Sequence, residues 1–139
     1  MISKTSSFSV RTKGKGTYEI TDKIREAVSD SGVREGTATV FITHTSASLI
    51  IFENADPSAR TDLHKYFEDL VPEDTPGFVH TLEGPDDMTS HIRMVLTRTS
   101  EVIPIAAGKL CLGTWQGVFV FEHRNQSHTR TIVFNVTGV

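Results

Sequence analysis

The chain has little cysteine, no excess of basic residues and no long apolar run, and each shortage excludes a class of protein. Its single cysteine cannot form an internal disulfide and is typical of a reducing compartment. A formal net charge of -3 is unlike the clustered Lys and Arg of a broad nucleic-acid surface. No apolar run approaches the roughly 20 residues that cross a bilayer. We therefore expect neither a nucleic-acid partner nor a membrane partner.

The first residues, MISKTSSFSV, lack the apolar block and cleavage site of a signal peptide, so we expect a cytoplasmic protein. With 139 residues, 37% of them apolar and 22% charged, the composition is that of an ordinary globular protein, and we expect one domain over residues 1–139. Strand-like segments dominate. Helical patterns occupy residues 21–32, Pro57 to about Leu70, and about Pro85 to about Arg98. Because helices and strands do not alternate regularly, the pattern predicts an α+β fold with a mostly antiparallel sheet.

The third helical segment combines an apolar stripe with ionisable residues. The residues that recur at helical spacing, and that we expect to be buried, are Met88, Ile92, Val95 and Leu96. His91 follows Met88 by three positions, so it shares or borders the same face. Asp86 and Asp87 fall in the first turn, where the helix dipole favours negative charge. The segment indicates either a capped helix with a core-edge histidine or part of a site.

Histidines are the strongest chemical signal in the sequence. Four of the six adjoin segments that we expect to be buried, namely His44, His80, His91 and His123. His64 and His128 stand in more polar surroundings, and we expect replacement of His64 by alanine to change little. Three imidazole ligands and a water form an open zinc site, although core histidines are the alternative, since no H-E-x-x-H or C-x-x-C motif is present. Carboxylates that can orient imidazoles or move protons are Glu53, Glu83, Asp86 and Asp87.

Two further segments allow both a binding role and a structural role. Around His44, the hydroxyls of Thr43, Thr45, Ser46 and Ser48 can hold an anion, or they can satisfy backbone groups at a strand connection. In LGTWQG, Trp115 can stack on a flat ring or anchor the core. We expect core packing for Trp115, and the role of Gln116 stays open.

Together these motifs resemble the YjbQ family of small proteins. The segments that carry the resemblance, in order, are HTSASLIIFENADPSARTD, HTLEGPDDMTSHI, SEVIPIAAGKLCLGTWQG and FEHR. The similarity extends from about Ile2 to the C-terminus. It implies an α+β fold with a large sheet, assembly as a homotrimer, and a histidine-lined pocket for a divalent metal. Histidine ligands favour zinc, and magnesium, which prefers oxygen ligands, is the alternative.

The resemblance and the motifs suggest roles for individual residues. The metal ligands we expect are His44, His80 and His91, with His123 as an alternative. The catalytic candidates are Glu83, Asp86 and Glu53. The residues expected to contact a small phosphorylated substrate are Thr45, Ser46, Ser48, Asn54, Trp115, Gln116 and Arg124. Asp56 and Asp87 lie in the same motifs as further candidates.

Members of the YjbQ family are described as secondary thiamine-phosphate synthases. The resemblance therefore implies a transferase acting on phosphorylated heterocyclic substrates. Such chemistry needs anion contacts, a divalent ion for the leaving pyrophosphate and a surface on which an aromatic ring can stack. A zinc-dependent hydrolase with a histidine-bound water and a non-catalytic trimer that binds a metal or an anion are the alternatives.

Overall fold

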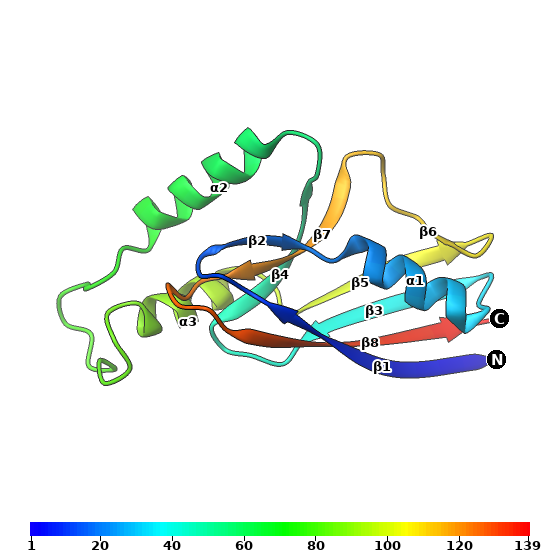
Figure 1. Ribbon diagram of the computed structural model, residues 1–139, viewed down its shortest axis with the longest axis horizontal. Helices are drawn as coiled ribbons and strands as arrows, with labels where there is room; N and C mark the ends of the chain where they lie inside the picture. The colour runs from blue at the N-terminus through cyan, green and yellow to red at the C-terminus, as the bar shows by residue number, and fades with distance from the viewer.

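Two antiparallel sheets form the frame of the protein in the computed structural model, which describes residues 1–139 (Figure 1). Five strands are ordered β1-β8-β3-β5-β6 in one sheet, and three are ordered β2-β7-β4 in the other. The strands are β1 (Ile2–Arg11), β2 (Gly16–Glu19), β3 (Gly36–Ile42), β4 (Ala47–Glu53), β5 (Ser100–Ala106), β6 (Lys109–Leu110), β7 (Gln116–Glu122) and β8 (Thr129–Gly138). The helices are α1 (Thr21–Ser31), α2 (Pro57–Leu70) and α3 (Asp87–Leu96). This architecture confirms the α+β prediction.

Three short connections between the two sheets lie at the same end of the molecule, the first of them residues 12–15 between β1 and β2. Residues 43–46 connect β3 of the larger sheet to β4 of the smaller one, and residues 123–128 connect β7 to β8. Ala47 and Glu122 pair across the smaller sheet, so the connection of residues 43–46 ends beside the point where that of residues 123–128 begins. The loop of residues 71–86 and α3 lie at this end too (Figure 1).

Alternating side chains of the two sheets build an apolar core that α1 closes. Fifteen buried residues form one cluster, with Val40 and Ile132 from the larger sheet and Leu49 and Val120 from the smaller one. Ile24 of α1 is wholly buried in it. The helix ends at Gly32, whose left-handed φ of 76° is costly for other residues.

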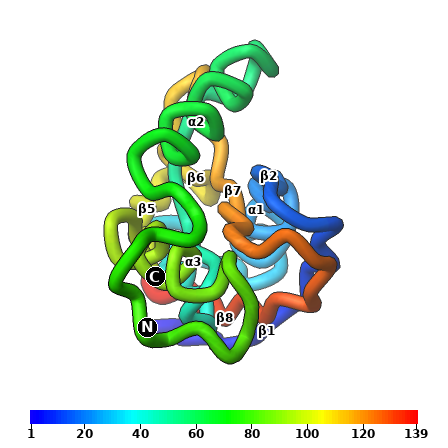
Figure 2. The backbone as a smooth tube through the Cα atoms, turned by 90° about the vertical axis from the view of Figure 1, so that its left-hand side faces the viewer, coloured from blue at the N-terminus to red at the C-terminus, as the bar shows by residue number.

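Helix α2 covers residues Pro57–Leu70, as predicted, because its start signal is local. Pro57 occupies the first turn, and the Asp56 carboxylate accepts a hydrogen bond from Ser58 N. Figure 2 shows the helix standing away from the sheets, and none of its residues is fully buried. No helix is long and apolar enough to cross a lipid bilayer.

The prediction for the buried face of α3 was wrong. Val95 and Leu96 are 73% and 54% exposed, and the buried residues of the helix are the polar Asp87, Thr89, Ser90 and Arg93. These residues find partners on neighbouring segments: Ser90 Oγ lies 2.8 Å from the carbonyl oxygen of His123, and Arg93 donates to that of Val71. The helix therefore docks through hydrogen bonds, and its apolar stripe is left facing outward.

Candidate metal centre

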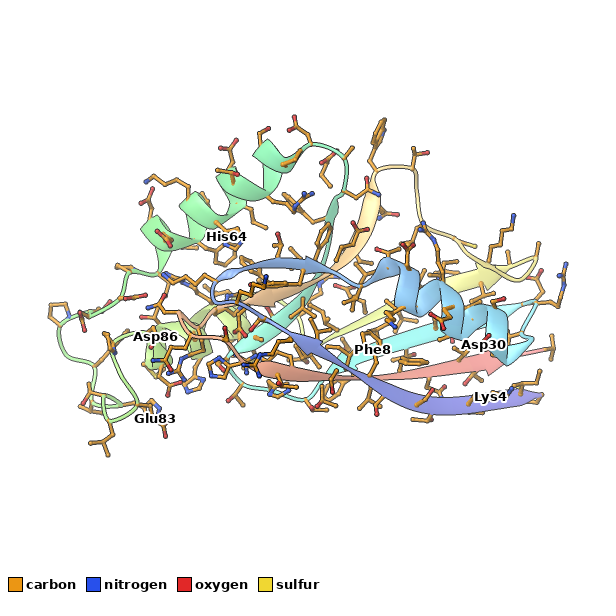
Figure 3. All side chains as sticks on the ribbon, in the orientation of Figure 1. Lys4, Phe8, Asp30, His64, Glu83 and Asp86 are labelled. Atoms are coloured by element: carbon orange, nitrogen blue, oxygen red, sulfur yellow. The ribbon has the colours of Figure 1, made fainter.

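The side chains of His80, Asp87 and His91 converge at the end of the molecule where the chain changes sheets. Their ligand atoms all lie within 4.8 Å of one another. Asp87 Oδ2 is 2.8 Å from His80 Nε2 and 3.1 Å from His91 Nε2. Figure 3 places Glu83 and Asp86, from the same segment, at this end of the molecule, and Lys4 at the opposite end. One carboxylate oxygen thus faces two imidazole nitrogens.

Local geometry explains why these three residues meet. Asp87 and His91 are four positions apart on α3, so their side chains share one helix face. His80 precedes the helix in the chain and returns to it through a turn at Gly84, whose φ is 105°. A left-handed φ of this size is easy for glycine alone.

Both ring nitrogens of His91 face hydrogen-bond acceptors, an arrangement that favours a bound cation at Nε2. His91 Nδ1 lies 2.6 Å from the carbonyl oxygen of Thr45, which can only accept, so Nδ1 carries a proton. Nε2 faces Asp87 Oδ2, another acceptor. The ring can satisfy both only if Nε2 carries a second proton or if a metal ion takes that place. Metal-bound histidines commonly have this arrangement, with the distal nitrogen held by a backbone carbonyl.

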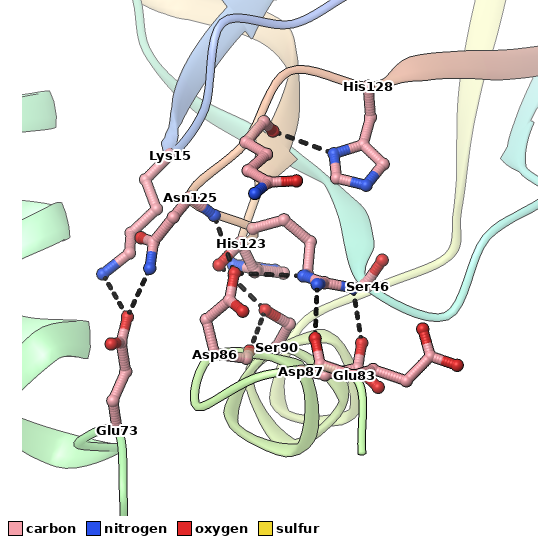
Figure 4. Close-up of polar contacts among 12 residues, drawn as sticks. Lys15, Ser46, Glu73, Glu83, Asp86, Asp87, Ser90, His123, Asn125 and His128 are labelled. Carbon is pink, nitrogen blue, oxygen red and sulfur yellow. Dashed lines mark hydrogen bonds and ion pairs between the residues drawn. The ribbon is translucent and has the colours of Figure 1, made fainter. Parts of the chain in front are cut away.

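Arg124 neutralises and orients the carboxylates at the start of α3. Its Nη1 lies 2.7 Å from Asp87 Oδ1, its Nε lies 3.0 Å from Asp86 Oδ2, and its Nη2 donates to the carbonyl oxygen of Glu83. Figure 4 shows Asp86 and Asp87 facing the segment after β7 that carries His123 and Asn125. Each side-chain nitrogen of Arg124 therefore already donates a hydrogen bond to an acceptor of the protein.

The pKa values of both aspartates lie below their usual value. Burial alone would raise the pKa of Asp86, but hydrogen bonds from Asn125 N and Arg124 outweigh it. Burial would likewise raise the pKa of Asp87. The hydrogen bond between Asp87 and His80, together with the nearby charges of His91 and Arg124, has the larger effect and lowers this pKa. Both carboxylates are thus ionised at neutral pH, as a metal ligand must be.

A cleft of about 520 Å³ opens beside His80. The residues lining it are Asp74, Thr75, Pro76, Gly77, Phe78, His80, Thr81, Gly84, Pro85 and Met88. No lysine or arginine is among them, and Asp74 contributes a carboxylate. A small molecule held there would lie next to the histidine–aspartate cluster.

His44 and His123, which we expected as a ligand and an alternative ligand, lie outside the cluster. His44 Nε2 accepts a hydrogen bond of 2.8 Å from Thr131 N, and burial, followed by the charge of Arg130, lowers the pKa of His44. His123 is only 1% exposed, and its Nε2 lies 2.9 Å from Ser48 Oγ. Burial, followed by the charge of Arg93, lowers the pKa of His123 to about 3. The lowered pKa values keep both rings neutral at pH 7, and one nitrogen of each ring already has a hydrogen-bond partner in the protein.

Four other predicted residues lie at the far end of the smaller sheet: Glu53, Asn54, Trp115 and Gln116. Glu53 pairs with Gln116 at the opposite end from the Ala47–Glu122 pair, roughly 20 Å along the strands. The Glu53 carboxylate accepts from the backbone N–H groups of Ala55 and Asp56, and Asn54 donates to the carbonyl oxygens of Thr114 and Gln116. Trp115 is 64% exposed, so the expectation of core packing was wrong.

Of the remaining candidates, Thr45, Ser46 and Ser48 form hydrogen bonds inside the protein, and the Glu83 side chain is exposed. Thr45 contributes its carbonyl oxygen to His91, whereas Ser46 and Ser48 are buried and bound to Arg130 and His123. The Glu83 side chain is exposed, and only its carbonyl oxygen contacts Arg124. Thr45, Ser46 and Ser48 are not among the residues that line the cleft beside His80.

Sequence reasoning missed the central place of Asp87, which it treated only as a supporting carboxylate. The available signal was the i, i+4 spacing of Asp87 and His91 on one predicted helix. Reasoning from sequence also missed the buried pair of Glu122 and Arg130, because an internal salt bridge has no spacing signature when its partners come from different sheets.

Comparison with known proteins agrees with the fold. Residues 6–139 match the family model described as UPF0047 protein YjbQ-like. A UPF0047 protein of Synechocystis sp. is 54% identical over 129 residues, which cover 93% of this chain and 88% of that protein. UPF0047 protein YjbQ of Salmonella typhimurium is 39% identical over 127 residues, 91% of each chain.

Solved structures agree as well. A protein from Aeropyrum pernix superposes with a TM-score of 0.89 at 28% identity, covering 98% of this chain and 99% of that one. A YjbQ/UPF0047 family protein from Clostridium acetobutylicum gives a TM-score of 0.86 at 33% identity, covering 95% of this chain and 99% of that one. The resemblance noted in the motifs is thereby confirmed, and the chain belongs to the YjbQ-like UPF0047 family.

Proposed function

We propose that the protein is a zinc-dependent hydrolase that acts on a small substrate in the cleft beside His80. The observation that carries the proposal is the convergence of three ligand atoms, from His80, Asp87 and His91, within 4.8 Å. The hydrogen bond from His91 Nδ1 to Thr45 leaves Nε2 directed at that point. The ligand set proposed here replaces His44 with Asp87.

The donor set suits zinc better than magnesium. Two imidazole nitrogens and one carboxylate oxygen are common zinc ligands, and three protein ligands leave room for a water or a substrate atom. Bound zinc supplies Lewis acidity to a substrate oxygen or to a water molecule. Arg124 holds the other oxygen of Asp87 and thereby sets the plane of the carboxylate.

The charges around the cleft favour hydrolysis over pyrophosphate chemistry. A substrate that carries a pyrophosphate needs free cationic groups. Arg124 is bound by Asp86, Asp87 and Glu83, and Lys15 pairs with Glu68 and Glu73. The thiamine-phosphate synthase-like activity on phosphorylated heterocycles that we expect from the resemblance stays a prediction.

Turnover on a panel of simple esters, amides and phosphate monoesters tests this proposal. We expect hydrolysis of at least one class, its loss on chelation and its return with added Zn²⁺. His91→Gln should abolish the activity, whereas His128→Gln, whose ring contacts only the carbonyl oxygen of Gln126, should retain it. Tight zinc binding without turnover on any member of the panel would favour the non-catalytic binding protein instead.

We also infer that the protein forms the homotrimer expected from the resemblance. The support is the outward face of α3, where an apolar groove of about 390 Å³ is lined by Thr45, Met88, His91, Ile92, Met94 and Val95. Exposed apolar surface of this kind often marks an interface between proteins. His91 lines the groove, so assembly would bring a second chain next to the candidate metal centre.

A further inference from the structure

Beneath the candidate metal centre lies a wholly buried ion pair between Glu122, at the end of β7, and Arg130, near the start of β8. The two residues are 0% and 3% exposed. Arg130 Nε lies 2.7 Å from Glu122 Oε1, and Arg130 Nη2 donates to Glu122 Oε2. The pair therefore joins the smaller sheet to the larger one where the chain crosses between them.

The Glu122 carboxylate collects hydrogen bonds from three further donors. Thr12 Oγ1 donates to Oε1 at 2.8 Å, and the backbone N–H groups of His123 and Arg124 donate to Oε2 at 3.0 and 3.2 Å. A buried carboxylate needs such partners, and its charge-assisted bonds hold the donors in one geometry. Glu122 thus places the backbone of Arg124.

From each member of the pair, a short path of contacts leads to the candidate ligands. Arg130 Nη2 lies 3.0 Å from Ser46 Oγ and 3.3 Å from its carbonyl oxygen, and the preceding residue, Thr45, accepts the hydrogen bond of His91 Nδ1. On the other path, Glu122 binds Arg124 N, and the Arg124 guanidinium binds Asp87 Oδ1.

We propose that the Glu122–Arg130 pair positions the metal centre, holding the backbone carbonyl that orients His91 and the guanidinium that orients Asp87. The inference rests on the proposed zinc site. Glu122 and Arg130 are positioning residues, since neither touches the three ligand atoms. Thr45 and Arg124 are the direct partners of the candidate ligands, and loss of such partners commonly weakens metal binding tenfold or more. Glu122 and Arg130 act on these partners one contact further out.

The test compares Arg130→Lys with the wild type in two measurements: Zn²⁺ affinity, by competition with a chelating dye, and the visible spectrum of the Co²⁺-loaded protein. Lysine keeps the charge but has a single nitrogen, which cannot bridge both Glu122 oxygens and Ser46. We expect about tenfold weaker Zn²⁺ binding and a changed Co²⁺ spectrum. Val136→Ala, at the far end of β8 and 1% exposed, is the control: it destabilises the core but should preserve both readouts.

Each outcome bears on a different claim. Wild-type affinity and spectrum in Arg130→Lys would overturn the positioning role and leave the zinc site standing. A wild type that binds no Zn²⁺ would overturn both. If Arg130→Lys does not fold, Thr12→Val keeps the side-chain shape and removes the hydroxyl that donates to Glu122 and that also contacts the backbone of His128. It should weaken Zn²⁺ binding less than Arg130→Lys does, and unchanged affinity would again contradict the inference.

Discussion

At the scale of single residues, the candidate metal ligands are the nitrogen and oxygen atoms that other hydrogen-bond partners leave free. His91 gives Nδ1 to Thr45 and Asp87 gives Oδ1 to Arg124, so Nε2 and Oδ2 are left to face each other. His44 instead uses Nε2 to accept from Thr131 N. The two histidines look alike in the sequence, and only their hydrogen bonds separate a potential ligand from a structural residue.

The buried, neutral His123 predicts a stability that depends on pH. Its pKa is lowered from 6.5 to about 3 in the folded protein, so between these values only the unfolded chain takes up the proton. The free energy of unfolding should therefore decrease on acidification, by about 1 kcal/mol between pH 6.5 and pH 5.5 from this residue. Urea unfolding at pH 6.5 and pH 5.5, with a chelator present, measures the change.

Other buried groups whose pKa values are lowered act in the same direction or at lower pH. Burial lowers the pKa of His44 and of His64, which adds to the decrease in the same direction. The lowered pKa values of Asp86, Asp87 and Glu122 affect stability mainly below about pH 5, where the unfolded carboxylates take up protons. His123→Gln should show a shallower dependence. Equal unfolding free energies of the wild type at both pH values would contradict the account.

At the scale of elements, prediction succeeded where the signal was local and failed where it depended on distant partners. The bounds of α2 follow from Asp56 and Pro57, which stand next to the helix. The inward face of α3 is polar because Val71 and the connection after β7 supply acceptors for Arg93 and Ser90. Those acceptors are remote in the sequence, so periodicity alone favoured the apolar stripe.

Helix α2 gives a second stability prediction, which corrects the expectation that His64→Ala changes little. The His64 ring packs edge-on against Phe121 with centroids 5.1 Å apart, and its Nε2 is buried without a hydrogen-bond partner. Removing the ring should lower the free energy of unfolding by about 1 kcal/mol, since lost packing outweighs relief of the unpaired nitrogen. Urea unfolding measures this.

The matched control is Lys65→Ala, the neighbouring residue on the solvent side of α2. Its side chain is 71% exposed and pairs with Asp69 in an i, i+4 contact that is worth little in water. Its unfolding free energy should stay within about 0.5 kcal/mol of the wild type. If His64→Ala and Lys65→Ala have the same free energy of unfolding, the His64 ring does not stabilise the packing of α2 on β7.

At the scale of the whole molecule, topology decides which predicted residues meet. Residue types singled out His80 and His91 as candidates, and the turn at Gly84 brings these two side chains together. Glu53 and Trp115 carried equally suggestive chemistry, but strand direction puts them at the other end of the smaller sheet. Strand order cannot be read from the sequence pattern. The types of the candidate residues could therefore be predicted, but which of them lie close together could be predicted only in part.

Assembly is the other property that belongs to the whole molecule. Light scattering should give a mass three times the 15.4 kDa of the chain. Val95→Asp, which introduces a charge on the outward face of α3, should shift that mass toward one chain without unfolding the protein. A monomeric wild type would contradict the trimer, and a trimeric Val95→Asp variant would remove α3 from the interface.

The central claim is that His80, Asp87 and His91 hold a divalent metal. The most direct measurement is Zn²⁺ stoichiometry, by plasma mass spectrometry after equilibration and desalting, of the wild type, His91→Gln and His44→Gln. The account predicts about one zinc ion per chain in the wild type and in His44→Gln, and almost none in His91→Gln. A zinc-free wild type, or full occupancy in His91→Gln, would contradict it.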